Sequence, residues 1–303
     1  AQRRSSAGTR GDAVALAANL AYYHSDPDRM PFLMYAVPQA SYLLGGGHYL
    51  RGGSQALSDR LVSLIREAGG IVEAGREVDI LKIEKHHIDA VGHHARAGGD
   101  PQTDFAPVAF GNAAPQRLAE MMSPTHRETF LASYAMRQPS ISLWTISIGL
   151  SRPALEFGVN HYSTFILPAW LKSLRDFREA PAILCEESGP RMPPYVFVDY
   201  SRIDSGLNPA APCLGSFCGM DKIENWAALS DQASRARRER WMERILADLN
   251  EHFPGIAGAV VHREMASAQT MSHYLNTPGG AVYGFASDAA TMTPKFMTPK
   301  TPI

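Results

Sequence analysis

The sequence predicts an α/β protein with antiparallel β-structure. Apolar residues recur at helical spacing in 54–70 and in 230–252. By contrast, segments 78–91, 140–150 and 193–203 alternate between apolar and polar residues or are rich in β-branched and aromatic ones. Pro-rich loops join the strand-like segments of the second half, which is typical of an antiparallel sheet.

The first helices are predicted at 13–23 and 30–44. The second of these segments is apolar but contains Pro31 and Pro38. A proline lacks the backbone N–H and crowds the preceding helical turn. We therefore expect short helices in 30–44, and we expect them to line a wall.

Two glycine clusters flank His48, Tyr49 and Arg51 in the segment GGGHYLRGGSQAL at 45–57. Glycine permits unusual backbone angles and close approach, so we expect this backbone to lie against another group, most simply a ligand. Ser54 is predicted to N-cap the next helix, which a glycine pair ends. That helix should bury one apolar face, formed by Leu57, Leu61, Leu64, Ile65 and Ala68.

Strands follow this helix. A β-hairpin is predicted at 78–91 with a polar turn at 85–87, and a further strand at 107–115 should lead into a short helix through Met122. The histidine pairs His86/His87 and His93/His94 would point to opposite faces of a strand, so we expect solvated side chains and no metal site.

The second half should contain an antiparallel sheet with strands at 140–150, 193–203 and 213–219. A long helix at about 230–252 should cover one face of that sheet and end before Pro254. The apolar face of this helix is formed by Trp241, Ile245, Leu246 and Leu249.

Composition excludes several classes of protein. Basic and acidic residues number 29 and 30, so no net charge attracts nucleic acid. The 3 cysteines lack C-x-x-C spacing, which indicates neither a disulfide framework nor a zinc site and favours a reducing, cytoplasmic location. No apolar run approaches the roughly 20 residues that a membrane-spanning helix needs.

Motifs for phosphate binding and for hydrolysis are incomplete. The spacing of 47–54 matches a P-loop, but Gly53 stands where the lysine is required, and no G-x-G-x-x-G fingerprint occurs. Ser54 lies in an approximate nucleophile elbow. A serine hydrolase therefore stays an alternative, with His262 or His273 as its base. The other alternative is a non-catalytic module that binds a hydrophobic ligand.

Four segments in order resemble motifs of the phytoene desaturase-like flavoproteins: GGGHYLRGGSQALSDRL, GGIVEAGREVDILKI, VAFGNAAPQR and NTPGGAVYGF. This group includes carotenoid desaturases, carotenoid isomerases and retinol saturases within the amine-oxidase-like FAD superfamily. The resemblance covers about 30–290. It implies an FAD-dependent oxidoreductase that desaturates, isomerises or saturates a long hydrophobic substrate, such as a carotenoid or retinoid.

The resemblance also implies site residues. The implied cofactor-binding residues are Gly47, Tyr49, Gly52, Gly53, Val78, Asn112 and Ala113. The implied substrate-lining residues are His48, Tyr35, Tyr42, Trp144, Gly279, Gly280 and Tyr283. No catalytic side chain is implied, because the flavin would carry the redox chemistry. The strand-end motif S-N-A-D-P of the group appears here as GNAAP, without its serine and aspartate.

The implied architecture is a partial FAD-binding domain of the amine-oxidase-like type, interleaved with a mixed α+β substrate domain. The FAD domain would comprise 46–122 and 273–303, and the substrate domain 1–45 and 123–272. Because the pyrophosphate-binding motif is missing, we expect an interior portion of a longer protein that alone binds FAD weakly or not at all. A lipophilic substrate and the apolar segment 30–44 also suggest peripheral contact with a membrane.

Overall fold

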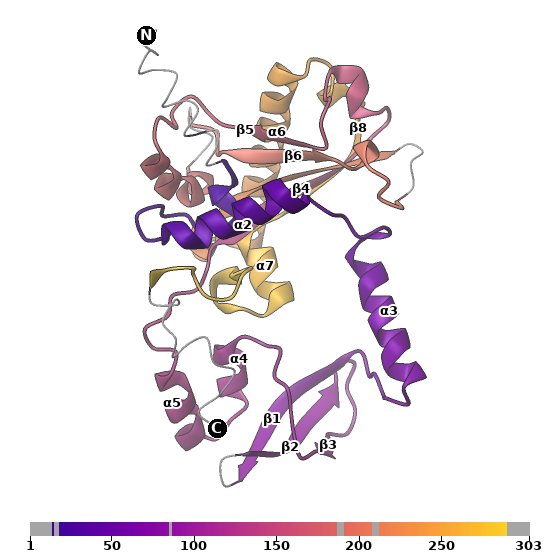
Figure 1. Ribbon diagram of the computed structural model, residues 1–303, viewed down its shortest axis with the longest axis vertical. Helices are drawn as coiled ribbons and strands as arrows, with labels where there is room; N and C mark the ends of the chain where they lie inside the picture. The colour runs from indigo at the N-terminus through magenta and orange to yellow at the C-terminus, as the bar shows by residue number, and fades with distance from the viewer. Residues whose placement is uncertain (1–13, 15–17, 85–86, 187–190, 208–211, 290–303) are drawn as a thin grey trace.

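The computed structural model describes residues 14, 18–84, 87–186, 191–207 and 212–289 (Figure 1). Its centre is a five-stranded antiparallel sheet in the order β5-β6-β7-β4-β8. The strands are β4 (Ser142–Leu150), β5 (Ser163–Ile166), β6 (Tyr195–Asp199), β7 (Cys213–Asp221) and β8 (Val260–Ala266). The chain is thus a mixed α/β protein with antiparallel sheets, which confirms the predicted class.

The central pair of strands has a regular register. Strand β4 pairs with β7 along its whole length, from Ser142 opposite Asp221 to Leu150 opposite Cys213. Strand β6 is shorter than predicted, because the Asp199 carboxylate accepts hydrogen bonds from the amide and hydroxyl of Ser201 (3.0 and 2.7 Å). These bonds turn the chain into a 3-10 helix, η4 (Tyr200–Arg202).

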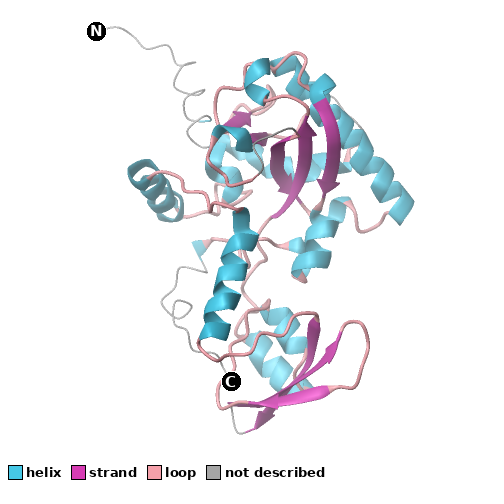
Figure 2. Ribbon diagram, turned by 90° about the vertical axis from the view of Figure 1, so that its right-hand side faces the viewer, coloured by secondary structure: helices cyan, strands magenta, loops and turns pink. Residues whose placement is uncertain are grey.

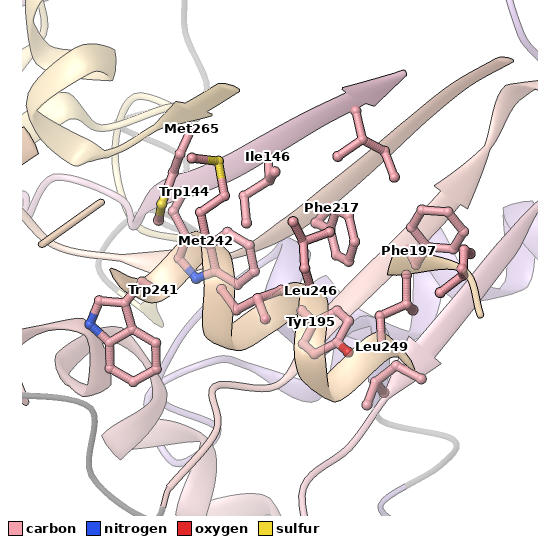
Figure 3. Packing of buried hydrophobic residues seen from close by; sticks show 14 of the residues in the cluster. Trp144, Ile146, Tyr195, Phe197, Phe217, Trp241, Met242, Leu246, Leu249 and Met265 are labelled. Carbon is pink, nitrogen blue, oxygen red and sulfur yellow. The ribbon is translucent and has the colours of Figure 1, made fainter. Parts of the chain in front are cut away.

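Helix α6 (Asp231–His252) covers one face of this sheet, as the sequence predicts. The Ser230 hydroxyl caps its start by accepting a hydrogen bond from the amide of Ala233 (3.3 Å). Figure 3 shows its apolar face against the sheet. This main core contains Trp144, Ile146, Tyr195, Phe197, Phe217, Trp241, Leu246 and Leu249.

Helix α2 (Phe32–Gly45) is one helix of 14 residues, so the prediction of several short helices is wrong. Pro31 precedes its first turn, where no N–H is needed, and Pro38 lies within it without ending it. Met34 and Tyr35 of α2 contact a second cluster that includes Met220 of β7. Helix α2 therefore lies on the side of the sheet opposite α6.

A three-stranded sheet, in the order β1-β2-β3, lies at the other end of the molecule (Figures 1 and 2). The predicted hairpin is confirmed as β1 (Arg76–Glu84) and β2 (His87–Ala95), although 85 and 86 of its turn lie outside the described residues. A third cluster joins it to two short helices. These are α4 (Pro115–Glu120) and α5 (Pro124–Ala132).

Two predictions for this sheet are wrong. Segment 107–115 is not a strand before α4; its Phe110 is 96% exposed and has no strand partner among the described residues. The third strand is instead β3 (Gln102–Phe105). Because β3 pairs with β2, His93 is buried rather than solvated, and its ring bonds Arg76 (2.8 Å) and Asp104 (2.9 Å).

Helix α3 (Gly53–Glu67) also departs from the prediction. Its N-cap is Gly52 in the left-handed conformation (φ 87°), and Ser54 lies inside the first turn. None of its described side chains is buried, so the expected buried face is exposed. The exposed fractions are 45% for Leu57, 51% for Leu61, 42% for Leu64 and 46% for Ile65.

Replacing Leu61 with glutamate should therefore change the free energy of unfolding of this chain by less than about 0.5 kcal/mol. The matched change Leu249→Glu on α6 should lower it by about 4 kcal/mol or more, because it buries an unpaired charge in the main core. Urea unfolding measures both. A loss above about 2 kcal/mol for Leu61→Glu would show that α3 is packed in solution.

Ion pairs connect the N-terminal part to η3 (Leu174–Cys185) and to the segment near the C-terminus. The predicted helix 13–23 lies partly outside the described residues, and its described part is the 3-10 helix η1 (Ala18–Tyr22). Arg178 pairs with Asp26 (2.7 Å) and with Asp28. Arg29 pairs with Asp288 near the C-terminus (3.1 Å).

His24 makes this part sensitive to pH. Its Nδ1 accepts a hydrogen bond from the amide of Asp26 (2.8 Å), and burial and Arg29 lower its pKa. The folded state thus binds fewer protons than the unfolded chain just below pH 6.5. Stability should fall as the pH drops through this range. Urea unfolding at pH 7.5 and 5.5 measures this loss. The difference in the free energy of unfolding between the two pH values should be smaller in His24→Gln than in the wild type. An unchanged difference would show that His24 does not cause the loss.

The remaining elements are short. They are η2 (Ala154–Phe157), η3 (Leu174–Cys185), η5 (Ile223–Asn225), η6 (Ala257–Ala259), α7 (Ala268–Leu275) and η7 (Pro278–Gly280). None of the described helices is long and apolar enough to cross a membrane. Within the described ranges, no group of three His, Cys, Asp or Glu residues could hold a metal ion, and the 3 cysteines are free.

Candidate functional site

The face of the five-stranded sheet opposite α6 carries small polar side chains. Along β4 and β7, Thr145 lies opposite Cys218 and Ser147 opposite Ser216. Neighbouring positions on the same strands, such as Ile146 and Phe217, point into the main core. This second face is only partly buried, in contrast to the core face.

Three tyrosines from separate segments meet at one end of this face. The ring of Tyr200, in η4, lies 5.6 Å from that of Tyr49 and 5.9 Å from that of Tyr162, measured between centroids. Tyr162 immediately precedes β5, and Tyr49 precedes α3. The first pair is tilted and the second edge-to-face. Aromatic contacts at these distances stabilise a surface by roughly 0.5–1.5 kcal/mol per pair.

Tyr22 extends this surface across the sheet. Its ring meets Phe165 of β5 edge-to-face at 6.0 Å. Burial raises its pKa well above the usual range, and Cys218, Tyr283, Tyr162 and Tyr200 act in the same direction. Tyr22 therefore lies within electrostatic reach of these groups. We call Tyr22, Tyr49, Tyr162, Tyr200 and Tyr283 the tyrosine cluster.

The tyrosine cluster is chemically neutral. Burial raises the pKa of Cys218 to about 11, so its thiol is protonated at pH 7 and is no nucleophile. Burial likewise raises the pKa values of Tyr162 and Tyr200, and the other groups that act on them are phenols and this thiol. Neither pKa is shifted by a carboxylate or a cation. The surface can hold an apolar or aromatic molecule but offers no acid–base pair.

The glycine segment before α3 packs against another part of its own chain, and ligand binding by this segment stays a prediction. The amide of Gly52 donates to the carbonyl of Ser205 (2.7 Å), and that of Gly53 donates to Leu50 (2.7 Å). A Cβ atom on Gly206 would lie 2.6 Å from Cγ of Arg51. Close packing of 51–52 against 205–206 therefore explains the glycine at 206.

The other implied cofactor-binding residues lie apart from one another. Gly47 packs against the ring of Tyr42. Val78 lies in β1 opposite His93, within the third cluster. Asn112 and Ala113 line a cavity of about 410 Å³ together with residues of 275–285. Cofactor binding by these residues stays a prediction.

The implied substrate-lining residues are distributed over several places. Tyr283 belongs to the tyrosine cluster through its interaction with Tyr22, whereas Trp144 is fully buried in the main core on the other side of the sheet. Tyr35 meets Tyr23 edge-to-face at 6.0 Å. The remaining ones are His48, whose ring bonds the Gly45 carbonyl, exposed Tyr42, Gly279, and buried Gly280.

Sequence reasoning missed Tyr22, Tyr162, Tyr200 and Cys218. One signal was present: Thr145 and Ser147 alternate with large apolar residues in SLWTISIGL, which indicates a sheet face of small polar residues. The tyrosines come from loops and 3-10 helices, where no periodicity relates them.

The hydrolase alternative lacks its geometry. Ser54 is exposed in the first turn of α3, and residues 46–50 before it form no strand. His262 lies in β8 and His273 in α7. Over the described residues, no hydrogen bond joins the Ser54 hydroxyl to either histidine. A nucleophile needs its base within hydrogen-bonding reach.

No protein-family model and no curated protein matches the chain. Among solved structures, the chain is similar to an oxidoreductase from Methanosarcina mazei, with a TM-score of 0.46 and 18% identity over 72% of this chain and 43% of that one. It is also similar to cyclohexylamine oxidase from Brevibacterium oxydans, with a TM-score of 0.44 and 14% identity over 92% of this chain and 57% of that one. The chain thus spans about half the length of these structures.

Proposed function

We propose that the chain is part of an FAD-dependent oxidoreductase that desaturates, isomerises or saturates a long hydrophobic substrate, with a carotenoid or retinoid as the substrate class. The observation that carries the proposal is the neutral tyrosine cluster, which includes Tyr49 of the first motif and Tyr283 of the last. The cluster thus draws on two segments of the resemblance that are far apart in sequence, which supports the proposal.

The chemistry of the cluster suits this class of reaction. A polyene has no acidic hydrogen, so its oxidation or reduction requires a cofactor rather than an acid–base pair. The phenols and the protonated thiol offer contact area to an apolar ligand. They carry no charge that such a ligand would have to cover and remove from water. In this proposal the chain binds and orients the substrate and excludes water.

The implied FAD residues fit the cofactor only in part. The amides of Gly52 and Gly53 already donate to Ser205 and Leu50, so they have no hydrogen left for a phosphate. Asn112 and Ala113, by contrast, line a cavity. We therefore propose that further parts of a longer flavoprotein hold most of the cofactor and cover the exposed apolar face of α3.

A visible absorption spectrum tests the cofactor. The longer protein, purified from cells, should show the paired bands of oxidised flavin, while the 303-residue chain with added FAD should show weak binding or none. Absence of flavin from the longer protein, even after reconstitution, would contradict the proposal.

Retinol binding, followed by quenching of protein fluorescence, tests the surface. Tyr200→Ala should weaken binding about tenfold, because it removes the ring that joins Tyr49 to Tyr162. Tyr274→Ala, at a tyrosine that is 80% exposed, is the matched control. Equal affinity of the two variants would place the ligand elsewhere. Retinol binding without flavin in the longer protein would instead support the non-catalytic binding module.

We also propose peripheral membrane contact through α2. Its exposed side chains Phe32 (81%), Leu43 (79%) and Leu44 (89%) offer apolar area to a bilayer surface. Flotation with neutral phosphatidylcholine liposomes should carry the protein upward, and Phe32→Ser with Leu43→Ser should reduce the floated fraction. Absence of the wild-type protein from the liposome fraction would exclude the contact.

A further inference from the structure

A separate cavity of about 580 Å³ lies at the end of the five-stranded sheet. Its walls come from the loop at 23–29, the start of β4, the end of β7 and the return segment at 278–286. The volume falls within the range of small-molecule sites. The tyrosine cluster takes no part in its described lining, and of the implied cofactor-binding and substrate-lining residues only Gly279 belongs to that lining.

Two buried hydrogen-bonding groups on this lining have no partner among the described residues. Nδ1 of His24 accepts the amide of Asp26 (2.8 Å), so the ring is neutral and carries its proton on Nε2, which has no acceptor. The hydroxyl of Ser142 is also without a partner. His24 is 6% and Ser142 3% exposed, so both side chains are removed from bulk water. Because a buried donor without an acceptor is costly, these groups indicate a ligand with an acceptor atom.

The charged groups around the cavity carry a net negative charge. They are three cations and five carboxylates, when the carboxylates paired with the two arginines are included: Arg29, Arg178, Lys222, Asp26, Asp28, Asp288, Asp221 and Glu224. Arg175 also pairs with Asp28 from outside the lining (3.2 Å), which removes only part of the excess. An anionic ligand would therefore be repelled.

The same carboxylates are poor partners for a cationic ligand. The two oxygens of Asp221 accept four hydrogen bonds, and arginines hold the three aspartates of the ion pairs. A cation would also bring further donors, which cannot satisfy the Nε2–H group of His24. A neutral molecule with an acceptor oxygen suits both the charge and the unpartnered groups.

We infer that this cavity binds a neutral carbonyl compound with a compact apolar body. The carbonyl oxygen would accept hydrogen bonds from Nε2 of His24 and from the Ser142 hydroxyl. A carbonyl oxygen has two lone pairs, so it can accept both bonds. The apolar body would contact the hydrophobic part of the lining, which includes Ile141, Ile223 and Pro181.

Acetophenone is the probe, and the ¹³C-labelled isoleucine methyl groups of the full chain are the reporters. Titration should shift the methyl signals of Ile141 and Ile223 and leave that of Ile148, in the main core, unchanged. The ¹⁵Nε2 signal of His24 should also shift, because this nitrogen gains an acceptor for its proton.

Three molecules of nearly the same shape separate the effect of the acceptor from that of charge. α-Methylstyrene has no oxygen, benzoate is an anion and benzamidinium is a cation. Each should bind at least about fivefold more weakly than acetophenone. The first lacks the acceptor, the second is opposed by the net negative charge, and the third offers only donors to His24.

A variant tests the second donor. Ser142→Ala should weaken acetophenone binding about fivefold with the fold intact, because this hydroxyl forms no hydrogen bond in the described part of the chain. Ser58→Ala, at an exposed serine of α3, is the matched control and should leave the affinity unchanged.

The inference fails if about 20 mM acetophenone leaves the Ile223 signal unchanged, since that concentration populates even a millimolar site. It also fails if α-methylstyrene, benzoate or benzamidinium binds as tightly as acetophenone, or if Ser142→Ala binds it as tightly as Ser58→Ala. None of these results depends on flavin or on the tyrosine cluster, so they leave the proposed function untouched.

Discussion

Replacing Asp221 with alanine is expected to lower the free energy of unfolding by about 4 kcal/mol at pH 7. The carboxylate is 1% exposed, and both of its oxygens are used. Oδ1 accepts hydrogen bonds from the Lys222 amide (2.8 Å) and the Asn225 side chain (2.7 Å), and Oδ2 accepts from the Trp226 indole and the Ala268 amide (both 2.8 Å). Alanine leaves these donors buried without a partner, at roughly 1–3 kcal/mol each before relaxation.

The position of Asp221 explains why this loss should affect the whole sheet. It is the last residue of β7, and its four bonds hold η5, the Trp226 ring and the first amide of α7. Asp204→Ala is the matched control, because that carboxylate forms an exposed ion pair with Arg51 worth less than about 1 kcal/mol. Urea unfolding compares the two variants, and a loss below about 1 kcal/mol for Asp221→Ala would refute the argument.

The pH dependence gives a second readout of the same residue. Burial raises the pKa of Asp221 from its ordinary 3.8 to about 6. The four hydrogen-bond donors lower this pKa, but burial is the larger effect. The folded state therefore keeps a proton that the unfolded chain releases between about pH 4 and 6. The shifted pKa therefore contributes about 3 kcal/mol to the free energy of unfolding. This contribution is complete below pH 4 and is lost as the pH rises through 6. Asp221→Ala should lack this component, so its deficit relative to wild type should be larger at pH 4 than at pH 7.

The main sheet and α6 could be predicted because their signals are local. The alternation in SLWTISIGL and the helical spacing of Trp241, Ile245 and Leu249 each lie within one segment. The apolar residues of each pattern also identify the face that is buried. The sequence therefore predicts that α6 covers one face of the sheet.

Helix α3 and segment 107–115 show where such patterns fail. An apolar helical face predicts burial only if another element covers it, and no described element covers Leu61. In the same way, the apolar residues around Phe110 form a strand only beside a partner with free hydrogen-bonding groups. The tertiary partner decides both cases, and a local pattern does not identify it.

The candidate site could be predicted only for its motif residues. Tyr49 and Tyr283 can be identified because they lie close to glycines in recognisable motifs, but Tyr22 and Tyr200 lie in short 3-10 helices. Their proximity depends on how η1 and η4 cross the second face of the sheet. That crossing depends on long-range contacts, such as the Gly52–Ser205 hydrogen bond, which no single segment encodes.

Gly280→Ala is expected to lower the free energy of unfolding by about 3 kcal/mol or more. Gly280 has a φ of +70°, a region in which a side chain costs roughly 1–2 kcal/mol. A Cβ atom there would also lie 2.5 Å from the carbonyl oxygen of Ala268 and 3.0 Å from the amide nitrogen of Ser272. These backbone atoms belong to α7 and cannot move without shifting that helix, whose first amide is held by Asp221.

Two glycine controls separate the cost of the positive φ from the cost of the steric overlap with α7. Gly284 has a φ of +73° but open space around its Cβ position, so Gly284→Ala should lose only about 1 kcal/mol. Gly258 has neither a positive φ nor a close neighbour, and Gly258→Ala should be nearly neutral. Chemical unfolding should therefore rank the losses as Gly280, Gly284 and Gly258. If Gly280→Ala were as stable as Gly258→Ala and only ligand binding changed, the glycine would serve a ligand rather than the packing of α7.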